Sequence, residues 1–189
     1  MYTVESIFQA QTEVKRSKFL SFLVPYNQFK EFHEELKAKH PKANHIIYAY
    51  RYLNEFAQIV ENSSDDGEPK GAAATPTLNQ LRGGSIIEAG ILTVRYFGGI
   101  KLGVGGMVRA YSSAAKAAIE AATLIPYEKS EEYIYTAPYS MQRQVEYHLE
   151  RCEISNIIRE FENNYVRWII TAPDSKLSKL RAALKQLLV

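Results

Sequence analysis

Glycine is distributed along this chain in a way that constrains its fold more than any other feature of the sequence. All ten glycines lie between Gly67 and Gly106, and the rest of the 189-residue chain contains none. Glycine adopts positive φ angles and allows close backbone approach, but at an entropic cost in the folded state. This concentration predicts a site built from backbone groups within residues 67–106.

The remaining composition is that of a globular protein of one or two domains. Hydrophobic residues make up 46% of the chain and charged residues 23%, which excludes a disordered or collagen-like protein. The single cysteine, Cys152, excludes an intramolecular disulfide and favours a reducing compartment. We expect no signal peptide and no membrane-spanning segment, and therefore a cytoplasmic protein without a membrane partner. The net charge of +2 is too small to indicate nucleic-acid binding by bulk charge, so any such binding requires a local cluster.

Hydrophobic periodicity and turn residues predict two α+β domains, residues 1–125 and 126–189. Asn27 is expected to cap the first helix, and Thr75 with Pro76 to begin the second. In the first domain we expect strands at 17–24, 45–53, 57–61 and within 86–96, and helices at 27–40, 75–83 and 107–122. In the second domain we expect strands at 132–137, 154–160 and 165–171, and helices at 140–152 and 174–188. This βαββα order is most of a ferredoxin-like unit.

An acidic motif, Ser64-Asp65-Asp66-Gly67-Glu68-Pro69, follows the third expected strand. Adjacent carboxylates repel one another unless solvent, a cation or basic groups compensate them. One interpretation is a Mg²⁺ site formed by Asp65, Asp66 and Glu68, and another is a hydrogen-bonding platform for a partner. The third is a solvated turn, since Asp, Gly and Pro all favour turns.

A glycine-rich motif runs from Arg95 to Tyr111 and reads RYFGGIKLGVGGMVRAY. It predicts a strand, a loop with five glycines and a helix whose first N–H groups would bind an anion. Basic side chains would add charge and aromatic rings would stack on bases, although the spacing fits neither a P-loop nor a dinucleotide fingerprint. The alternative is a tight packing element. The candidate anion- or nucleic-acid-binding residues are Arg95, Tyr96, Phe97, Gly98, Gly99, Lys101, Gly103, Gly105, Gly106 and Arg109. The candidate polar or partner-binding residues are His45, Ser64, Asp65, Asp66, Gly67 and Glu68.

Taken together, the acidic motif and the glycine-rich motif resemble the signature of the YigZ/IMPACT family. Lys15, Ser17, Phe19 and Ala43-Asn44-His45 fit the same resemblance, which covers residues 13–120 strongly. The tail resembles the small C-terminal domain of the two-domain bacterial members. One departure is Gly71-Ala72-Ala73-Ala74, where the family usually has Gly-Thr-Ala-Gly. We expect this change to alter the loop and to remove a threonine hydrogen bond.

The resemblance implies a fold and a class of function. The N-terminal domain is expected to be like the second domain of a small-subunit ribosomal protein, and the C-terminal domain like the ferredoxin-like last domain of elongation factor G. Eukaryotic members regulate translation by countering a starvation-sensing kinase through its activator protein, and no established catalytic activity comes with the family.

Three functions stay open at this point. The first is a non-enzymatic cytoplasmic regulator that binds RNA, the ribosome or a translation-associated protein, without a cofactor. The second is a Mg²⁺-dependent enzyme acting on a phosphorylated small molecule or nucleotide, with His45 as proton donor. The third is a pure protein-docking module. The sequence leaves the oligomeric state open.

Overall fold

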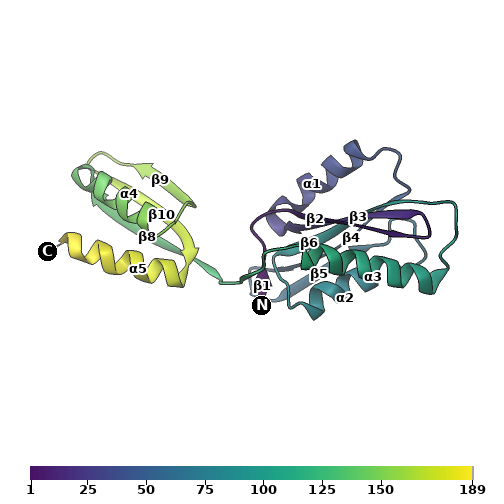
Figure 1. Cartoon of the computed structure of the whole chain (residues 1–189). Coiled ribbons are helices and arrows are strands. Elements are labelled where there is room, and N and C mark those ends of the chain that lie inside the picture. The colour runs from purple at the N-terminus through teal and green to yellow at the C-terminus, as the bar shows by residue number, and fades with distance from the viewer. Residues whose placement is uncertain (189) are drawn as a thin grey trace. The chain divides into compact units, whose positions relative to one another are not determined.

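The computed structural model describes residues 1–188, which fold as two compact units, Met1–Tyr127 and the residues from Glu128 onward. Each unit combines an antiparallel β-sheet with helices, so the protein is a two-domain α+β protein (Figure 1). No helix in this part of the chain is both long and apolar enough to cross a membrane.

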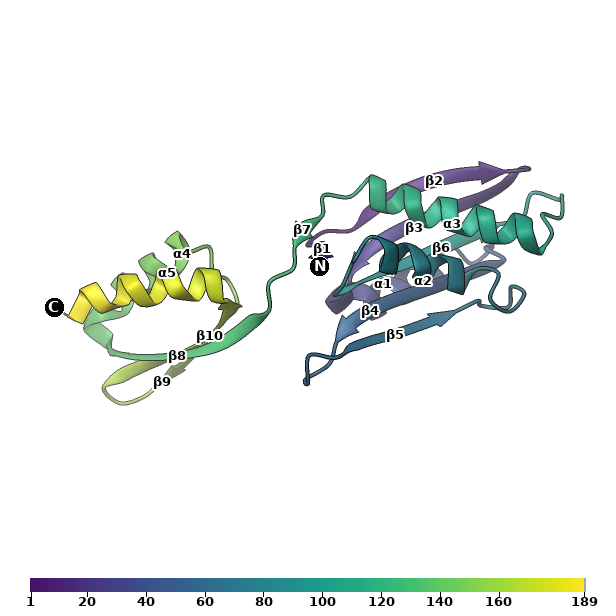
Figure 2. The ribbon, with the colours of Figure 1, turned by 90° about the horizontal axis from the view of Figure 1, so that it is seen from below.

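The first unit is built on a five-stranded sheet with helices on both faces (Figure 1 and Figure 2). Its strands are β2 (Phe8–Val14), β3 (Ser17–Pro25), β4 (His45–Leu53), β5 (Ile59–Ser64) and β6 (Ala89–Tyr96), and a short pair is formed by β1 (Tyr2–Thr3) and β7 (Ile125–Pro126). Its helices are α1 (Tyr26–Lys39) on one side of the sheet, and α2 (Ala74–Gly83) and α3 (Val104–Glu120) on the other. The order in the sheet is β2-β3-β6-β4-β5, and every neighbouring pair is antiparallel.

Coverage on both faces explains why every residue of the central strand β6 except Tyr96 is buried. Leu92 and Val94 pack with Phe29 on the α1 side, whereas Ile91 packs in the cluster that includes Leu81 of α2. Gly90 lets α1 lie close to the sheet, because a Cβ there would be only 2.5 Å from Phe29 Cδ2.

Two helices begin earlier than the sequence predicted. α1 begins at Tyr26, so Asn27 lies inside its first turn and makes no capping hydrogen bond. α2 begins at Ala74, not after Thr75, because its first N–H groups are held by the carboxylate of Asp65. A cap supplied by a residue distant in sequence leaves no signal at the start of the helix itself.

The start of α3 also differs from the prediction. The helix begins at Val104 and not at Met107, so Gly105 and Gly106 belong to its first turn and not to the loop. The glycine loop therefore comprises residues 97–103.

The second unit contains a three-stranded antiparallel sheet in the order β8-β10-β9. Trp168 is fully buried between this sheet and the helices, together with Val145, Leu149, Leu177 and Leu180. The elements follow the predicted βαββα order: β8 (Ser130–Pro138), η1 (Tyr139–Met141), α4 (Gln142–Arg151), β9 (Ile157–Phe161), β10 (Tyr165–Pro173), α5 (Asp174–Lys185) and η2 (Gln186–Leu188).

Candidate functional site

A row of three side chains crosses the first sheet where β6 approaches the glycine loop. Arg95 of β6 is paired with Phe19 of β3 on one side and with His45 of β4 on the other. Residues directly paired across strands project to the same face of a sheet. Phe19 packs with residues of α3, so the three side chains share the face that α2 and α3 cover.

The carboxylate of Glu68 is buried against this row. Its Oε1 accepts hydrogen bonds from Arg95 Nη1 at 2.5 Å and from Tyr111 Oη at 2.6 Å, and His45 Nε2 lies 3.9 Å from the same atom. Glu68 is only 8% exposed. A carboxylate so deeply buried is stable only when it is paired and hydrogen-bonded. The contacts of Glu68 therefore join the acidic turn, β6 and α3 into one site.

The guanidinium of Arg95 lies close to two aromatic rings. Its Cζ is 5.6 Å from the ring centre of Phe19 and 5.7 Å from that of Phe97, and Nη1 also lies 3.7 Å from Met107 Sδ. Cations are attracted to aromatic faces at such distances. Burial, reinforced by the Glu68 carboxylate, raises the pKa of Tyr111 far above its ordinary value. Tyr111 therefore remains a hydrogen-bond donor.

Asp65 shapes the acidic turn through backbone contacts. Its carboxylate accepts hydrogen bonds from the N–H groups of Gly71 (2.8 Å), Ala73 (3.0 Å) and Ala74 (2.8 Å). Burial alone would raise the pKa of the Asp65 carboxyl, but the donors at Ala74, Gly71 and Ala73 together lower it below the ordinary value. Asp65 thus serves as the cap of α2.

Asp66 fixes the orientation of His45. The Asp66 carboxylate accepts the N–H of Ile46 at 2.6 Å, and its backbone carbonyl oxygen lies 2.6 Å from His45 Nδ1. A carbonyl oxygen can only accept, so Nδ1 must carry a hydrogen. In the neutral ring Nε2 is then an acceptor, and this is the atom nearest Glu68.

The glycine loop is held against the β2–β3 turn. Gly98 approaches the turn so closely that a Cβ would lie 2.1 Å from the carbonyl carbon of Arg16. The loop is further anchored by a 2.8 Å hydrogen bond from the Phe97 N–H to Asn44 Oδ1. Gly103, with φ of +71°, ends the loop as the N-cap of α3.

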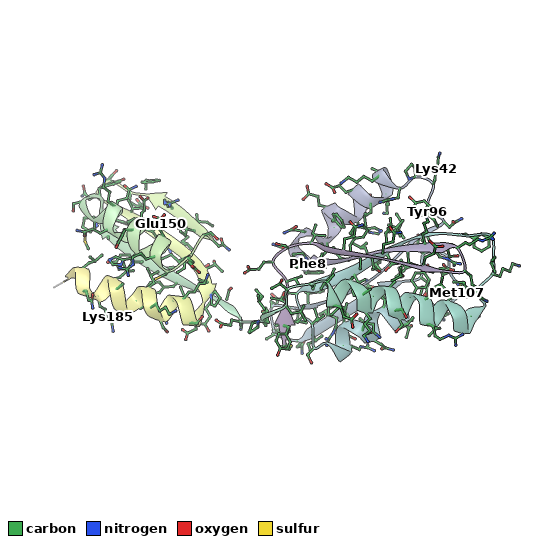
Figure 3. The ribbon with its side chains drawn as sticks, viewed as in Figure 1. Phe8, Lys42, Tyr96, Met107, Glu150 and Lys185 are labelled. Atoms are coloured by element: carbon green, nitrogen blue, oxygen red, sulfur yellow. The ribbon has the colours of Figure 1, made fainter. Side chains whose placement is uncertain are left out.

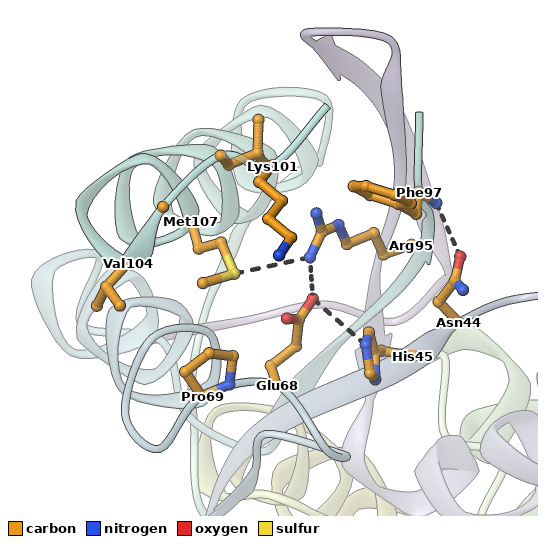
Figure 4. A pocket seen from close by; sticks show the side chains of 11 residues that line it. Asn44, His45, Glu68, Pro69, Arg95, Phe97, Lys101, Val104 and Met107 are labelled. Carbon is orange, nitrogen blue, oxygen red and sulfur yellow. Dashed lines mark hydrogen bonds and ion pairs between the residues drawn. The ribbon is translucent and has the colours of Figure 1, made fainter. Parts of the chain in front are cut away.

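These elements enclose a pocket of about 410 Å³, which we call the Arg95 pocket (Figure 4). Concave sites that combine apolar walls with a few polar groups are typical of small-ligand binding. The lining consists of polar Asn44, His45, Glu68, Arg95 and Lys101, apolar Pro69, Phe97, Leu102, Val104 and Met107, and Gly103.

Six of the ten predicted anion- or nucleic-acid-binding residues do not line this pocket: Tyr96, Gly98, Gly99, Gly105, Gly106 and Arg109. Tyr96 projects to the α1 face of the sheet (Figure 3). Its hydroxyl is 2.7 Å from His40 Nδ1. Consecutive strand residues point to opposite faces, so Tyr96 cannot share the surface of Arg95. Arg109 lines a separate cavity of about 170 Å³ together with Lys15. The predicted cluster of Arg95, Lys101 and Arg109 is therefore divided between two cavities.

The three acidic side chains do not converge on a common point. Asp65 binds the start of α2, Asp66 binds β4 and Glu68 pairs with Arg95. In residues 1–188 no three His, Cys, Asp or Glu side chains are grouped so as to hold a metal ion.

The remaining predicted residues have local roles. The Ser64 hydroxyl accepts the Asp66 N–H at 3.2 Å. Gly67 and Gly99 adopt positive φ angles of +85° and +83°. A Cβ at Gly67 would meet the His45 ring at 3.5 Å.

The predicted site residues did not include Tyr111, which donates to Glu68, or five residues that line the pocket: Asn44, Pro69, Leu102, Val104 and Met107. Met107 and Tyr111 are four residues apart on α3, a spacing that places both on one helix face. Both lie within the glycine-rich motif, and this spacing is the signal that would have indicated them.

The alanine segment that departs from the family pattern is compatible with the turn. Ala72, Ala73 and Ala74 are buried, and Ala73 and Ala74 contact Asp65 through backbone N–H groups. These contacts require no particular side chain, so the substitutions leave the capping interaction intact.

Comparisons with known proteins agree with this architecture. The family model of the Impact N-terminal domain matches residues 15–119. The chain is 32% identical over 177 residues to IMPACT family member YigZ of Escherichia coli (strain K12), covering 91% of this chain and 85% of that protein. It is 37% identical over 129 residues to an IMPACT family member from Thermus thermophilus, covering 67% of this chain and 68% of that protein.

Solved structures give a similar result for the fold. A crystal structure of a hypothetical protein aligns with a TM-score of 0.71 at 29% identity, covering 98% of this chain and 91% of the other. The two-domain translational regulator Yih1 aligns with a TM-score of only 0.38 at 25% identity, covering 64% and 47%, which is too low to support an inference. The family model covers more than half of the chain and YigZ is similar along most of its length, so this chain belongs to the IMPACT family.

Proposed function

We propose that this protein is a non-enzymatic, cytoplasmic regulator associated with translation, which binds RNA or the ribosome through the glycine loop and the surface around it. The resemblance to a family with translation regulators supports the biological context, and the charges around the loop support the type of partner.

The observation that carries this proposal is a group of basic side chains around the glycine loop. Lys15, Arg16, Lys101 and Arg109 are all exposed, and none of them has an ion-pair partner within residues 1–188. Lys15 and Arg16 form the β2–β3 turn with positive φ angles of 47° and 66°. The close approach of Gly98 to Arg16 brings this turn beside the loop. Unpaired basic groups of this kind suit a phosphate backbone.

The fold of each unit is compatible with the same context. The five-stranded sheet with helices on both faces supports a likeness of the first unit to the second domain of a small-subunit ribosomal protein. The βαββα order supports a ferredoxin-like second unit, similar to the last domain of elongation factor G. Fold alone does not determine function, so the proposal rests on the charged surface.

The other two functions receive less support. A Mg²⁺-dependent enzyme would need carboxylates that are free to bind the ion, whereas Asp65, Asp66 and Glu68 each hold other groups of the protein. Docking to a translation-associated protein uses the same exposed loop, and becomes the favoured function if RNA and ribosomes do not bind.

The test is binding of RNA and of ribosomes over a salt series, with and without Mg²⁺. We expect affinity to fall as salt rises, and the Lys101→Ala/Arg109→Ala double variant to weaken binding and reduce the salt slope by about 1 for each lost phosphate contact. Lys37→Ala/Lys39→Ala is the matched control, because it removes two ion-paired lysines from α1, which covers the opposite face of the sheet. Equal binding by wild type and the loop variant would contradict the proposal.

A further inference from the structure

Arg95 holds hydrogen-bond donors that the protein itself does not use. Nη1 is bound to Glu68, but Nε is buried and has no partner, and no described residue accepts a hydrogen bond from Nη2. The Arg95 side chain is only 7% exposed. Buried donors are seldom left unpaired in native proteins. An arginine fork with two free donors matches two oxygens of one anion.

Two further positive groups border the same pocket. Lys101 lies in its lining, and α3 begins there with Gly103, which has no side chain to cap the helix. The first intrahelical hydrogen bond joins the Met107 N–H to Gly103 O, so the preceding N–H groups have no partner within the helix. Glu68 balances Arg95, which leaves Lys101 and the positive end of the helix to attract an anion.

The other walls of the pocket are aromatic and apolar, so they suit a ligand that carries a flat apolar group as well as an anion. Phe97 is 46% exposed and Val104 59% exposed, and both line the pocket with Met107. An exposed aromatic ring beside apolar side chains accepts a flat heterocycle by stacking.

Hydrogen-bond acceptors complete the lining. His45 is held by the Asp66 carbonyl with Nε2 as the accepting atom in its neutral form. Oε2 of Glu68 receives no hydrogen bond within the described part of the chain. Both acceptors lie close to the Arg95 fork, so the pocket can receive hydroxyl groups next to an anion.

We propose that the Arg95 pocket binds a nucleoside monophosphate, either free or as the phosphorylated terminal nucleotide of an RNA strand. The phosphate contacts the Arg95 fork, Lys101 and the start of α3. The base packs on Phe97, and ribose hydroxyls donate to His45 and Glu68. Inorganic phosphate satisfies only the first set of contacts and a nucleoside only the others. The proposal rests on the proposed function in one respect, which is that this face of the first unit is the binding face.

The experiment is calorimetric titration of the full chain with the four nucleoside 5′-monophosphates, their nucleosides and inorganic phosphate. We expect at least one monophosphate to bind at least about tenfold more tightly than its nucleoside or phosphate alone, because each lacks one set of contacts. Short RNAs with a 5′-phosphate or a 5′-hydroxyl distinguish the two sources. Tighter binding of the RNA with a 5′-phosphate would identify the ligand as the end of an RNA strand. Equal binding of the two RNAs would identify the ligand as the free nucleotide. Failure of every monophosphate and of the phosphorylated RNA to bind would overturn the proposal.

Variants locate the ligand. Lys101→Ala and Phe97→Ala change exposed residues, so both proteins should fold, and each should weaken monophosphate binding about tenfold. Arg95→Lys keeps the charge but removes the fork, and should abolish binding. Lys116→Ala is the matched control, because Lys116 is an exposed lysine of α3 that pairs with Glu120 and lines neither cavity. Unchanged affinity in both the Lys101 and Phe97 variants would contradict the site.

The outcomes for this inference and for the proposed function are separable. Salt-dependent RNA binding without any nucleotide binding contradicts this inference alone. Nucleotide binding without affinity for longer RNA or ribosomes contradicts the proposed function alone.

Discussion

At the scale of residues, the site depends on three neighbouring carboxylates that are each compensated inside the fold. Asp65 is bound by backbone N–H groups, Asp66 by the N–H of Ile46, and Glu68 by Arg95 and Tyr111. These separate sets of donors remove the repulsion expected of adjacent charges. The acidic motif is therefore a structural connection between β4, α2 and the pocket, and of its three carboxylates only that of Glu68 lines the pocket.

Asp65 should make the stability of the first unit depend on pH. Its native pKa lies below the ordinary aspartate value of about 3.9, so its contribution is fully present above that pH. The contribution is lost as the pH falls through the lower native pKa. Asp65→Asn should lower the free energy of unfolding at neutral pH by about 0.5–2 kcal/mol, as expected for a lost cap, and should make acid unfolding less steep.

Urea unfolding at a series of pH values between about 7 and about 3 tests this prediction. Glu55→Gln is the control, since Glu55 lies exposed in the turn between β4 and β5 and should leave both stability and its pH dependence unchanged. The same pH dependence in Asp65→Asn and wild type would show that Asp65 is not a structural cap.

At the scale of elements, the glycine-rich segment is made of positions with different physical requirements. Gly98 is required by the close approach to Arg16, and Gly103 by its positive φ at the start of α3. Gly105 lies in the helix, where an added Cβ would meet only the Arg109 guanidinium at 3.7 Å. Substitution should therefore be costly at Gly98 and Gly103 in the loop, whereas Gly105 in the first turn of α3 should tolerate it.

Alanine substitutions should separate these requirements. Gly98→Ala should destabilise the protein by about 3 kcal/mol, because backbone must move to relieve the overlap. Gly105→Ala should be neutral or stabilise by up to about 1 kcal/mol, because alanine loses less entropy in a helix. Urea unfolding measures both, and equal effects of the two substitutions would contradict the assigned roles.

At the scale of the whole molecule, each unit has its own buried core. The cluster around Trp168 contains only residues of the second unit, and the three other buried clusters contain only residues of the first. The first unit is closed by the pairing of β1 with β7 and by the hydrogen bond from the Tyr127 N–H to Met1 O at 3.0 Å. A separate core and closed ends are what an independently folding domain requires.

A fragment of residues 1–127 should therefore unfold cooperatively in urea. The matched control is a fragment of residues 1–124, which lacks β7 and should unfold at a lower urea concentration because β1 has lost its partner. Circular dichroism follows both transitions. A fragment of residues 1–127 without a cooperative transition would show that the first unit depends on the second.

The sequence alone was sufficient for much of the fold, and for the location of the candidate site along the chain. Periodicity and turn residues indicated all five α-helices and most strands because these signals act over a few neighbouring residues, but they did not indicate β1, β2 or β7. The helix ends predicted at Gly83 and His40 lie within one residue of those observed, since glycine and the residue before proline limit a helix locally. The acidic and glycine-rich motifs likewise held five of the predicted residues that line the Arg95 pocket, namely Glu68, Arg95, Phe97, Lys101 and Gly103, and the sixth, His45, was predicted separately.

Only the tertiary structure decided how these residues are combined. The Asp65 cap on α2, the Glu68–Arg95–Tyr111 contacts and the close approach of Gly98 to Arg16 all join segments distant in sequence. The separation of Arg95 from Tyr96 follows from the pleat of β6, and that of Arg95 from Arg109 follows from the position of α3. Local sequence determines which elements form and which residues they carry. Strand register and helix packing determine which side chains meet, because those contacts depend on long-range burial that no local pattern records.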